Sequence, residues 1–149
     1  MARSICLDVG LRRVGVAVCD ESKMIARPLR VLELKKGMEP AQAAQLVFGE
    51  LARMSEYAQS DEVVIGYPLN SDGSQSEQTR LVLAFVDEAR KLAALPIKLA
   101  DERYSTAAAR EIIGAKKRKK QDTHDDAHAA AIILQRYLDE QLRITNYEL

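Results

Sequence analysis

The amino-acid sequence predicts an α/β fold in which a mixed sheet carries helices on its faces. Strand-forming segments rich in Val, Ile and Leu occupy residues 4–34, and helical patterns alternate with short strands from residue 40 onward. This order is typical of a sheet that packs against helices. A chain of 149 residues is long enough for its own core, so we expect a single domain over residues 1–149.

The first two strands are predicted within residues 4–18, joined by a turn centred on Leu11 and Arg12. This register places one wholly apolar face on the hairpin, made of Ile5, Leu7, Val9, Val14, Val16 and Val18. Asp8 lies on the opposite face, where its cross-strand neighbours are small and leave room for an ion or a backbone. The alternative is an ordinary acid at a strand end near a turn.

The remaining elements follow from periodicity and turn residues. A third strand is predicted at 24–34, where Pro28 indicates an edge position. Short buried strands are predicted at 61–66 and 96–100. Helices are predicted at 40–57, from the turn-rich segment 67–75 to about 95, from Ser105-Thr106 to about Gly114, and from 123 to about 142.

Composition gives little direct indication of function. The 22 basic and 22 acidic residues cancel, so evidence for a nucleic-acid partner must come from local clusters. No apolar run is long enough to cross a bilayer, and the first residues lack the pattern of a signal peptide. Cys6 and Cys19 lie in predicted strands without metal-ligand spacing, which favours buried thiols and a cytoplasmic location.

Three acidic side chains come at the ends of predicted elements: Asp8, Glu102 and Asp126. Sites in α/β sheets form beyond the carboxyl ends of strands, so we expect Glu102 and Asp8 to lie close together. Converging carboxylates repel one another unless they bind cations, and all-oxygen ligation suits Mg²⁺ or Mn²⁺. Two such ions, bridged by Asp8 and flanked by the other two acids, could clamp a phosphodiester for attack by water.

Asp126 has two interpretations. Helical spacing places it at the head of a core-facing stripe with Ala129, Ala130, Ile133, Leu134 and Tyr137. The alternative is a capping box with Thr123, where the helix dipole also favours an acid. Asp122 and Asp125 are weaker candidates. His124 and His128 lack partners at metal-ligand spacing, although a histidine near two metals could help to move protons.

Basic residues border the proposed acidic site and could contact phosphates without reading sequence. They are Arg12, Arg13, Arg103 and the run Lys116, Lys117, Arg118, Lys119 and Lys120. The alternative for the run is a solvated loop. Tyr67 and Tyr104 could stack on bases, or could be ordinary rim residues.

Four motifs carry a resemblance to a known family. They are LDVGLRRVGVAVCD at 7–20, VVIGYPLNSDGS at 63–74, DERYSTAAAR at 101–110 and DDAHAAAIILQRYLD at 125–139. In their order and spacing the chain resembles the YqgF/RuvX-type family, described as Holliday junction resolvases and as pre-16S ribosomal RNA nucleases, within the ribonuclease-H-like superfamily. Cys19 departs from the Ser or Thr common there, and the loop before Asp126 is unusually basic.

The resemblance implies a ribonuclease-H-like fold: a five-stranded mixed sheet, its first three strands antiparallel, flanked by helices. It implies a catalytic acidic triad of Asp8, Glu102 and Asp126, and metal-dependent nuclease activity in 5′-end processing of pre-16S ribosomal RNA. A Holliday junction resolvase or other DNA repair nuclease is the alternative within this class, and would favour a homodimer.

Two hypotheses from other classes remain open. One is a non-catalytic nucleic-acid-binding factor in ribosome assembly or transcription, which needs no metal. The other is an actin-like ATPase, because the hairpin also resembles a phosphate-gripping one. Enzymes of that class need two such domains, and this chain has room for one.

Overall fold

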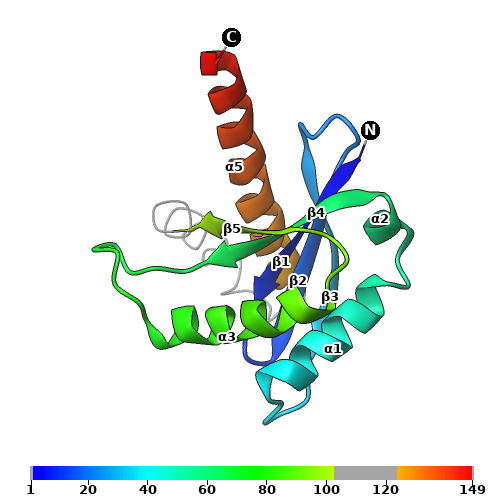
Figure 1. Ribbon diagram of the computed structural model, residues 1–149, viewed down its shortest axis with the longest axis vertical. Helices are drawn as coiled ribbons and strands as arrows, with labels where there is room; N and C mark the ends of the chain where they lie inside the picture. The colour runs from blue at the N-terminus through cyan, green and yellow to red at the C-terminus, as the bar shows by residue number, and fades with distance from the viewer. Residues whose placement is uncertain (1, 103–123, 149) are drawn as a thin grey trace.

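A computed structural model describes residues 2–102 and 124–148 of the chain (Figure 1). Its strands are β1 (Arg3–Val9), β2 (Arg13–Cys19), β3 (Ala26–Glu33), β4 (Ser60–Tyr67) and β5 (Ile97–Asp101). Its helices are α1 (Pro40–Leu51), α2 (Ser55–Ala58), α3 (Glu77–Leu92) and α5 (His124–Glu148). The helix predicted from Ser105 to Gly114 lies outside the described residues.

The five strands form one mixed sheet in the order β3-β2-β1-β4-β5. The first three strands pair antiparallel, and β4 and β5 run parallel to β1, which confirms the predicted fold class. The hairpin has the predicted register, because Leu7 pairs with Val16 and Val9 with Val14. Pro28 lies on the edge strand β3, as expected, close to a register shift between Val16 and Ala17.

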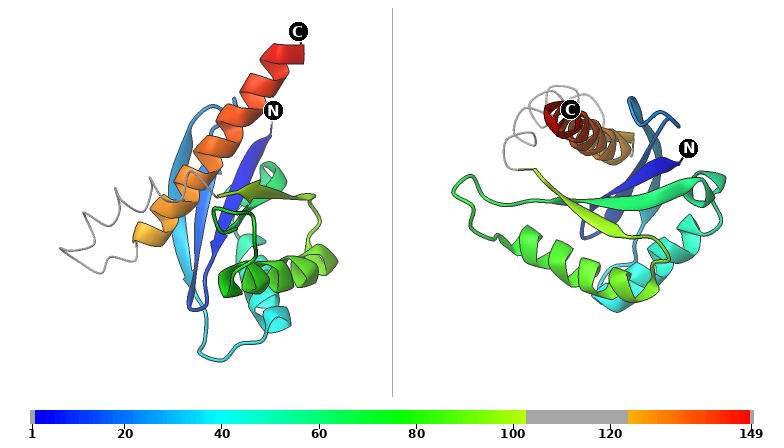
Figure 2. Two further views of the ribbon diagram at one scale, coloured as in Figure 1. Left: turned by 90° about the vertical axis from the view of Figure 1, so that its left-hand side faces the viewer. Right: turned by 45° about the horizontal axis from the view of Figure 1, so that its top comes forward.

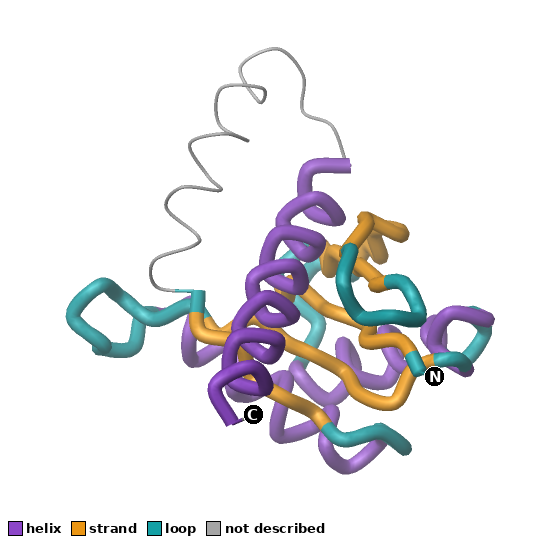
Figure 3. The backbone as a smooth tube through the Cα atoms, turned by 90° about the horizontal axis from the view of Figure 1, so that it is seen from above, coloured by secondary structure: helices purple, strands orange, loops and turns teal. Residues whose placement is uncertain are grey.

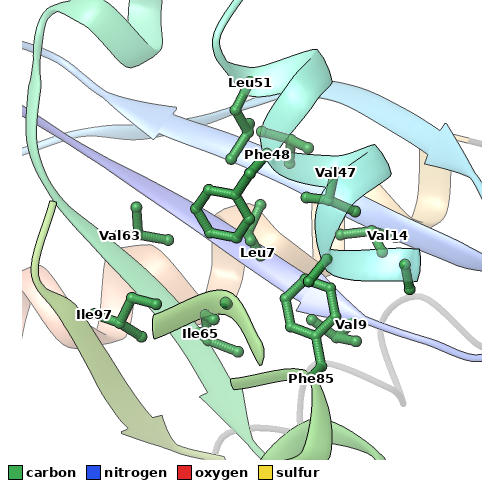
Figure 4. Close-up of a cluster of buried hydrophobic side chains, with 14 of the residues drawn as sticks. Leu7, Val9, Val14, Val47, Phe48, Leu51, Val63, Ile65, Phe85 and Ile97 are labelled. Atoms are coloured by element: carbon green, nitrogen blue, oxygen red, sulfur yellow. The ribbon is translucent and has the colours of Figure 1, made fainter. Parts of the chain in front are cut away.

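Helices cover both faces of the sheet (Figure 2). The apolar hairpin face packs against α1 and α3, where Phe48 and Phe85 lie with ring centroids 6.4 Å apart (Figure 4). On the other face, α5 crosses the sheet and packs on smaller side chains (Figure 3). That second cluster includes Cys6, Ala17, Cys19 and Val64 from the sheet, with Ala130, Ala131, Ile133, Leu134 and Leu138 from α5.

The helix predicted at 40–57 is wrong in one respect, because it is two helices. Met54 adopts an extended conformation (φ −95°, ψ 131°) between α1 and α2. Its side chain is only 7% exposed and belongs to the core beneath α1, so burial of this residue outweighs continuation of the helix. The last helix also continues past the predicted end at 142, to Glu148.

Two further observations concern the surroundings of the sheet. Both cysteines are buried and form no disulfide, as the sequence predicts. Within the described part of the chain, no helix combines the length and the apolar character that a membrane span requires.

Candidate active site

Asp8 is the polar residue around which the candidate site is built. It lies one residue before the end of β1, is half-buried, and pairs across the hairpin with Gly15. On the other side, β1 pairs in parallel with β4, where Leu7 lies opposite Ile65. The next residues along these two strands are Asp8 and Gly66, so a glycine lies beside Asp8 on each neighbouring strand.

Gly15 allows α5 to approach the sheet closely. A Cβ atom placed on Gly15 would lie 2.0 Å from the carbonyl oxygen of Asp126 and 3.0 Å from the backbone nitrogen of Ala127. These are backbone atoms of the first turns of α5, which cannot rotate away as a side chain could. The lack of a side chain at Gly15 therefore allows the backbone of Asp126 to lie against β2, the strand next to the one that carries Asp8.

Gly66 plays the corresponding part for Glu102. A Cβ atom on Gly66 would lie 2.8 Å from Oε2 of Glu102 and 2.9 Å from Cδ1 of Ile133. Glu102 directly follows β5, is only 6% exposed, and its backbone N–H donates a hydrogen bond to the carbonyl oxygen of Tyr67 (3.1 Å). The carboxylate of Glu102 thus lies against Gly66, between the strand end and α5.

The charges of two of these acids reach the same buried group. Burial raises the pKa of the Cys6 thiol well above its ordinary value, and the negative charges of Asp8 and Glu102 raise it further. Cys6 lies two residues before Asp8 on the same face of β1. The carboxylates of Asp8 and Glu102 are therefore both close enough to the buried Cys6 thiol for their charges to affect it.

The structure thus gathers the three predicted acids at one end of the sheet, on the face that α5 covers. Among residues 2–102 and 124–148, however, no group of three or more His, Cys, Asp and Glu side chains is placed to hold a metal ion. Asp126 is half-buried and lies at the margin of the buried stripe of α5, which is centred on Ala127, Ala130, Ala131, Leu134 and Leu138. Three members of the predicted stripe, Ala130, Ile133 and Leu134, are buried as expected, whereas Asp126, Ala129 and Tyr137 are half-buried at its margin.

The predicted basic residues fall into two groups. Arg12 in the β1–β2 turn and Arg13 at the start of β2 are both exposed, at the same end of the sheet as Asp8, and Nε of Arg13 lies 4.0 Å from Oε1 of Glu33. Arg103 and the run from Lys116 to Lys120 lie outside the described residues, as do Tyr104, Asp122 and the proposed cap Thr123. His128 is exposed on α5.

Sequence reasoning missed the part played by Gly66. The pattern shows Gly15 as one of several small residues opposite Asp8, but it predicts Gly66 only as the last residue of the strand at 61–66 and the first of a loop that could approach the substrate, with a strand-to-helix turn as the alternative. A single glycine at the end of an otherwise Val- and Ile-rich strand is the signal that could have indicated a close approach. Glu102 is predicted as a site residue, but its contact with Gly66 depends on the pairing of β5 with β4, which the sequence does not show.

Comparison with known proteins now gives the family. A family model described as "RuvX: Holliday junction resolvase" matches residues 2–140. A protein of Rickettsia akari named "Putative pre-16S rRNA nuclease" is 36% identical over 143 residues, which cover 94% of this chain and 88% of that one. A protein of the same name from Dictyoglomus thermophilum is 35% identical over 139 residues, covering 92% and 95%.

Solved structures share the fold at low sequence identity. Thermus thermophilus RuvC in complex with a Holliday junction substrate aligns with a TM-score of 0.51 at 16% identity, over 89% of this chain and 92% of that one. The fowlpox virus Holliday junction resolvase aligns with a TM-score of 0.52 at 13% identity, over 94% and 99%. These matches confirm the ribonuclease-H-like fold, and the family match and the curated relatives together show that the chain belongs to the RuvX family of nucleases.

Proposed function

We propose that this protein is a metal-dependent nuclease that hydrolyses phosphodiester bonds at the end of the sheet where Asp8, Glu102 and Asp126 meet. The observation that carries the proposal is the pair of close approaches on either side of Asp8. The backbone of Asp126 lies over Gly15, and the carboxylate of Glu102 lies over Gly66. Asp8 thus lies between two acids that are held over its two neighbouring strands, and carboxylates gathered in this way are costly unless cations compensate them.

The donor set fits a hard divalent cation. All three candidate ligands are carboxylates, and oxygen-only ligation favours Mg²⁺ or Mn²⁺ over softer metals. Asp8, in the middle, would bridge two ions, with Glu102 and Asp126 as the outer ligands. When bound, the ions would supply Lewis-acid stabilisation of the phosphate and a water of lowered pKa.

The protein's own residues would then orient this chemistry. Asp8 is fixed by the central strand of the sheet, Glu102 by its backbone hydrogen bond to Tyr67, and Asp126 by the packing of α5. Burial of Glu102 lowers the local polarity, which strengthens the attraction of a carboxylate for a cation. Arg12 and Arg13 stand at the rim, where they would hold the nucleic-acid backbone without reading its sequence.

The substrate we favour is the 5′ end of precursor 16S ribosomal RNA. The relatives from Rickettsia akari and Dictyoglomus thermophilum are named for that activity, and their similarity extends over most of both chains. The family description favours a second candidate, cleavage of Holliday junctions. A non-catalytic nucleic-acid-binding factor is the alternative without a metal. The homodimer and the cytoplasmic location stay predictions.

A substrate panel separates these functions. Precursor 16S ribosomal RNA, four-way DNA junctions and single strands would be incubated with the protein in Mg²⁺, in Mn²⁺ or in a chelator. Metal-dependent cleavage of the ribosomal precursor supports the favoured function, and preferential cleavage of junctions supports the second. Calorimetry with Mn²⁺ tests the non-catalytic alternative: if no substrate is cut and Mn²⁺ does not bind near neutral pH, the nuclease proposal is wrong.

A further inference from the structure

A second basic surface lies beyond the β1–β2 turn. The backbone N–H of Leu34 donates a hydrogen bond to the carbonyl oxygen of Arg12 (2.9 Å), which joins this turn to the loop between β3 and α1. Lys35 and Lys36 follow directly and are both exposed. The left view of Figure 2 shows the turn and the loop together at one end of the sheet. Three cations from two distant segments thus lie in one neighbourhood.

The two lysines line a shallow hollow of about 530 Å³ beside the start of α1. We call it the lysine hollow; besides Lys35 and Lys36, it is lined by Gln42, Gln45, Met38 and Leu46. Its polar side chains are therefore amines and amides, and no carboxylate is among its described lining residues. The Oε1 atom of Gln42 accepts a hydrogen bond from the backbone N–H of Glu39 (3.1 Å), so the NH₂ group of Gln42 remains as a donor.

The two lysines of the hollow are not neutralised by acidic side chains in the part of the chain that the structure describes. Lys23 forms ion pairs with Asp61 and Glu62, and Lys91 with Glu88. Among residues 2–102 and 124–148, Lys35 and Lys36 form no ion pair and Arg12 forms none either. A group of positive donors without internal partners is suited to an anionic ligand.

The lysine hollow and the acids lie at the same end of the sheet but toward opposite faces, because α1 packs on the apolar hairpin face and the acids lie on the face that α5 covers. β3 runs in the same direction as β1, because both are antiparallel to β2, and Val31 pairs with Gly15, which pairs with Asp8. Lys35 comes four residues after Val31. β3 ends at Glu33, so Lys35 lies just beyond the end of this strand, which runs about 10 Å to the side of β1, and the hydrogen bond from Leu34 to Arg12 holds it beside the β1–β2 turn.

The β1–β2 turn, which lies between the acids and the lysine hollow, is held in place by hydrogen bonds. The side-chain NH₂ of Gln78, in the first turn of α3, donates to the carbonyl oxygen of Val9 (2.7 Å). The N–H of Gly10 donates to the carbonyl oxygen of Arg13 (2.9 Å). The turn is thus fixed to α3 on one side and to the β3–α1 loop on the other. A polymer laid across it would meet Arg12 and the lysines at constant spacing.

We propose that the lysine hollow binds backbone phosphates of the nucleic acid that the acidic site cleaves. The inference rests on the proposed function for the class of ligand, and it extends the contact surface from the acids across the turn to α1. Because the donors are two amines and two amides with no stacking aromatic in the lining, the contact would add affinity without base readout. The same nucleic acid would then reach from the acids around the end of the sheet, past Arg12, to the hollow.

The salt dependence of binding tests this inference. The Lys35→Ala/Lys36→Ala double variant would be made in an Asp8→Asn background, so that no cleavage occurs, and its affinity for labelled precursor RNA and for a four-way junction measured at several salt concentrations. The slope of log K against log salt is negative, and each lost phosphate contact reduces its magnitude by about 0.7 on single strands and about 0.9 on duplex. We expect a decrease of about 1.4 to 1.8, equal for unrelated sequences of one structure.

The matched control is Arg90→Ala/Lys91→Ala in the same background. These residues are exposed at the far end of α3, and their loss changes the net charge by the same two units. An unchanged slope for this control, and restoration by Lys35→Arg/Lys36→Arg, would support a local contact. An equal decrease in both double variants, or no decrease in Lys35→Ala/Lys36→Ala, would overturn the proposal. If that second variant showed no decrease while thermal denaturation showed an intact fold, the hollow would be better suited to an acidic protein surface than to nucleic acid.

The outcomes are independent of catalysis. The binding assay needs no cleavage, so a change of slope in a protein without nuclease activity would support the lysine hollow and contradict only the proposed function. Conversely, confirmed cleavage with an unchanged slope would contradict the lysine hollow and leave the acidic site as proposed.

Discussion

The backbone of Asp126 lies directly against Gly15, so closely that a Cβ atom on Gly15 would come within 2.0 Å of the carbonyl oxygen of Asp126. Gly15 is also the cross-strand partner of Asp8. The residue that lets α5 reach the sheet is therefore the one that pairs with the central acid. The fold and the candidate site depend on the same close approach.

Replacement of Gly15 by alanine should displace the start of α5. Because the clash is with backbone, the helix itself must move, and overpacking of this kind costs roughly 1–3 kcal/mol of the free energy of unfolding. We expect a lower denaturation midpoint and a loss of nuclease activity. The control is Gly49→Ala in α1, where an added Cβ meets nothing within 4 Å and should stabilise the helix by up to about 1 kcal/mol. A Gly15→Ala variant as stable and active as wild type would contradict the close approach.

Replacement of Gly66 by alanine should separate stability from activity. The added Cβ would meet the carboxylate of Glu102 and the Cδ1 atom of Ile133, which are side-chain atoms that can move aside. We expect a smaller loss of stability than for Gly15→Ala, but a displaced carboxylate and hence a clear loss of cleavage rate. Both variants would be compared by chemical denaturation and by single-turnover cleavage. If Gly66→Ala lost stability and activity in the same proportion as Gly15→Ala, the loss of activity would follow from destabilisation alone, and the role proposed for Glu102 in cleavage would be contradicted.

Tyr137 should anchor α5 to the sheet at a distance from the acids. Its hydroxyl donates a hydrogen bond to Oε1 of Glu62 (3.0 Å), and Glu62 also accepts one from the hydroxyl of Ser4 (2.6 Å). Burial, then the charge of Glu62 and this hydrogen bond, raise the pKa of Tyr137 from 10.0 to about 12. The neutral phenol is the stabilising form, so its contribution is complete below pH 10 and is lost as the pH rises toward 12.

A spectrophotometric titration of the tyrosines checks this anchor. The chain has five tyrosines, so the difference between wild type and Tyr137→Phe isolates one of them. We expect that difference to show a transition near pH 12, and the variant to lose at most about 1 kcal/mol at neutral pH, because the site is partly open to solvent. Identical titration curves would show that Tyr137 is not held by Glu62.

The hairpin and the overall fold could be predicted from the sequence because their signals are local. Alternation of Val and Ile fixed the register that places Asp8 opposite Gly15, and Pro28 indicated the edge strand. The break at Met54 could not be predicted, since its helical periodicity is intact and only the depth of the core decides that it is buried in an extended conformation.

Contacts between segments that are distant in the chain could not be predicted from the sequence either. Glu102 meets Gly66 because β5 pairs with β4, and neither local pattern indicates that register. Lys35 and Lys36 are two lysines in a loop until the hydrogen bond from Leu34 to Arg12 places them beside the first turn. On α5, Ala127 and Leu138 are buried where Asp126 and Tyr137 were expected, and the backbone of Ala127 lies close to Gly15.

The most direct test of the account is the cleavage rate of Asp8→Asn in Mn²⁺ beside that of Asp87→Asn. Asp87 is exposed on α3, on the opposite face of the sheet, so the control makes the same chemical change away from the site. If Asp8 is the central metal ligand, its loss should lower the rate by at least about a hundredfold, with unchanged thermal stability and an unchanged rate for Asp87→Asn. Cleavage by Asp8→Asn at the wild-type rate would contradict the assignment of the site.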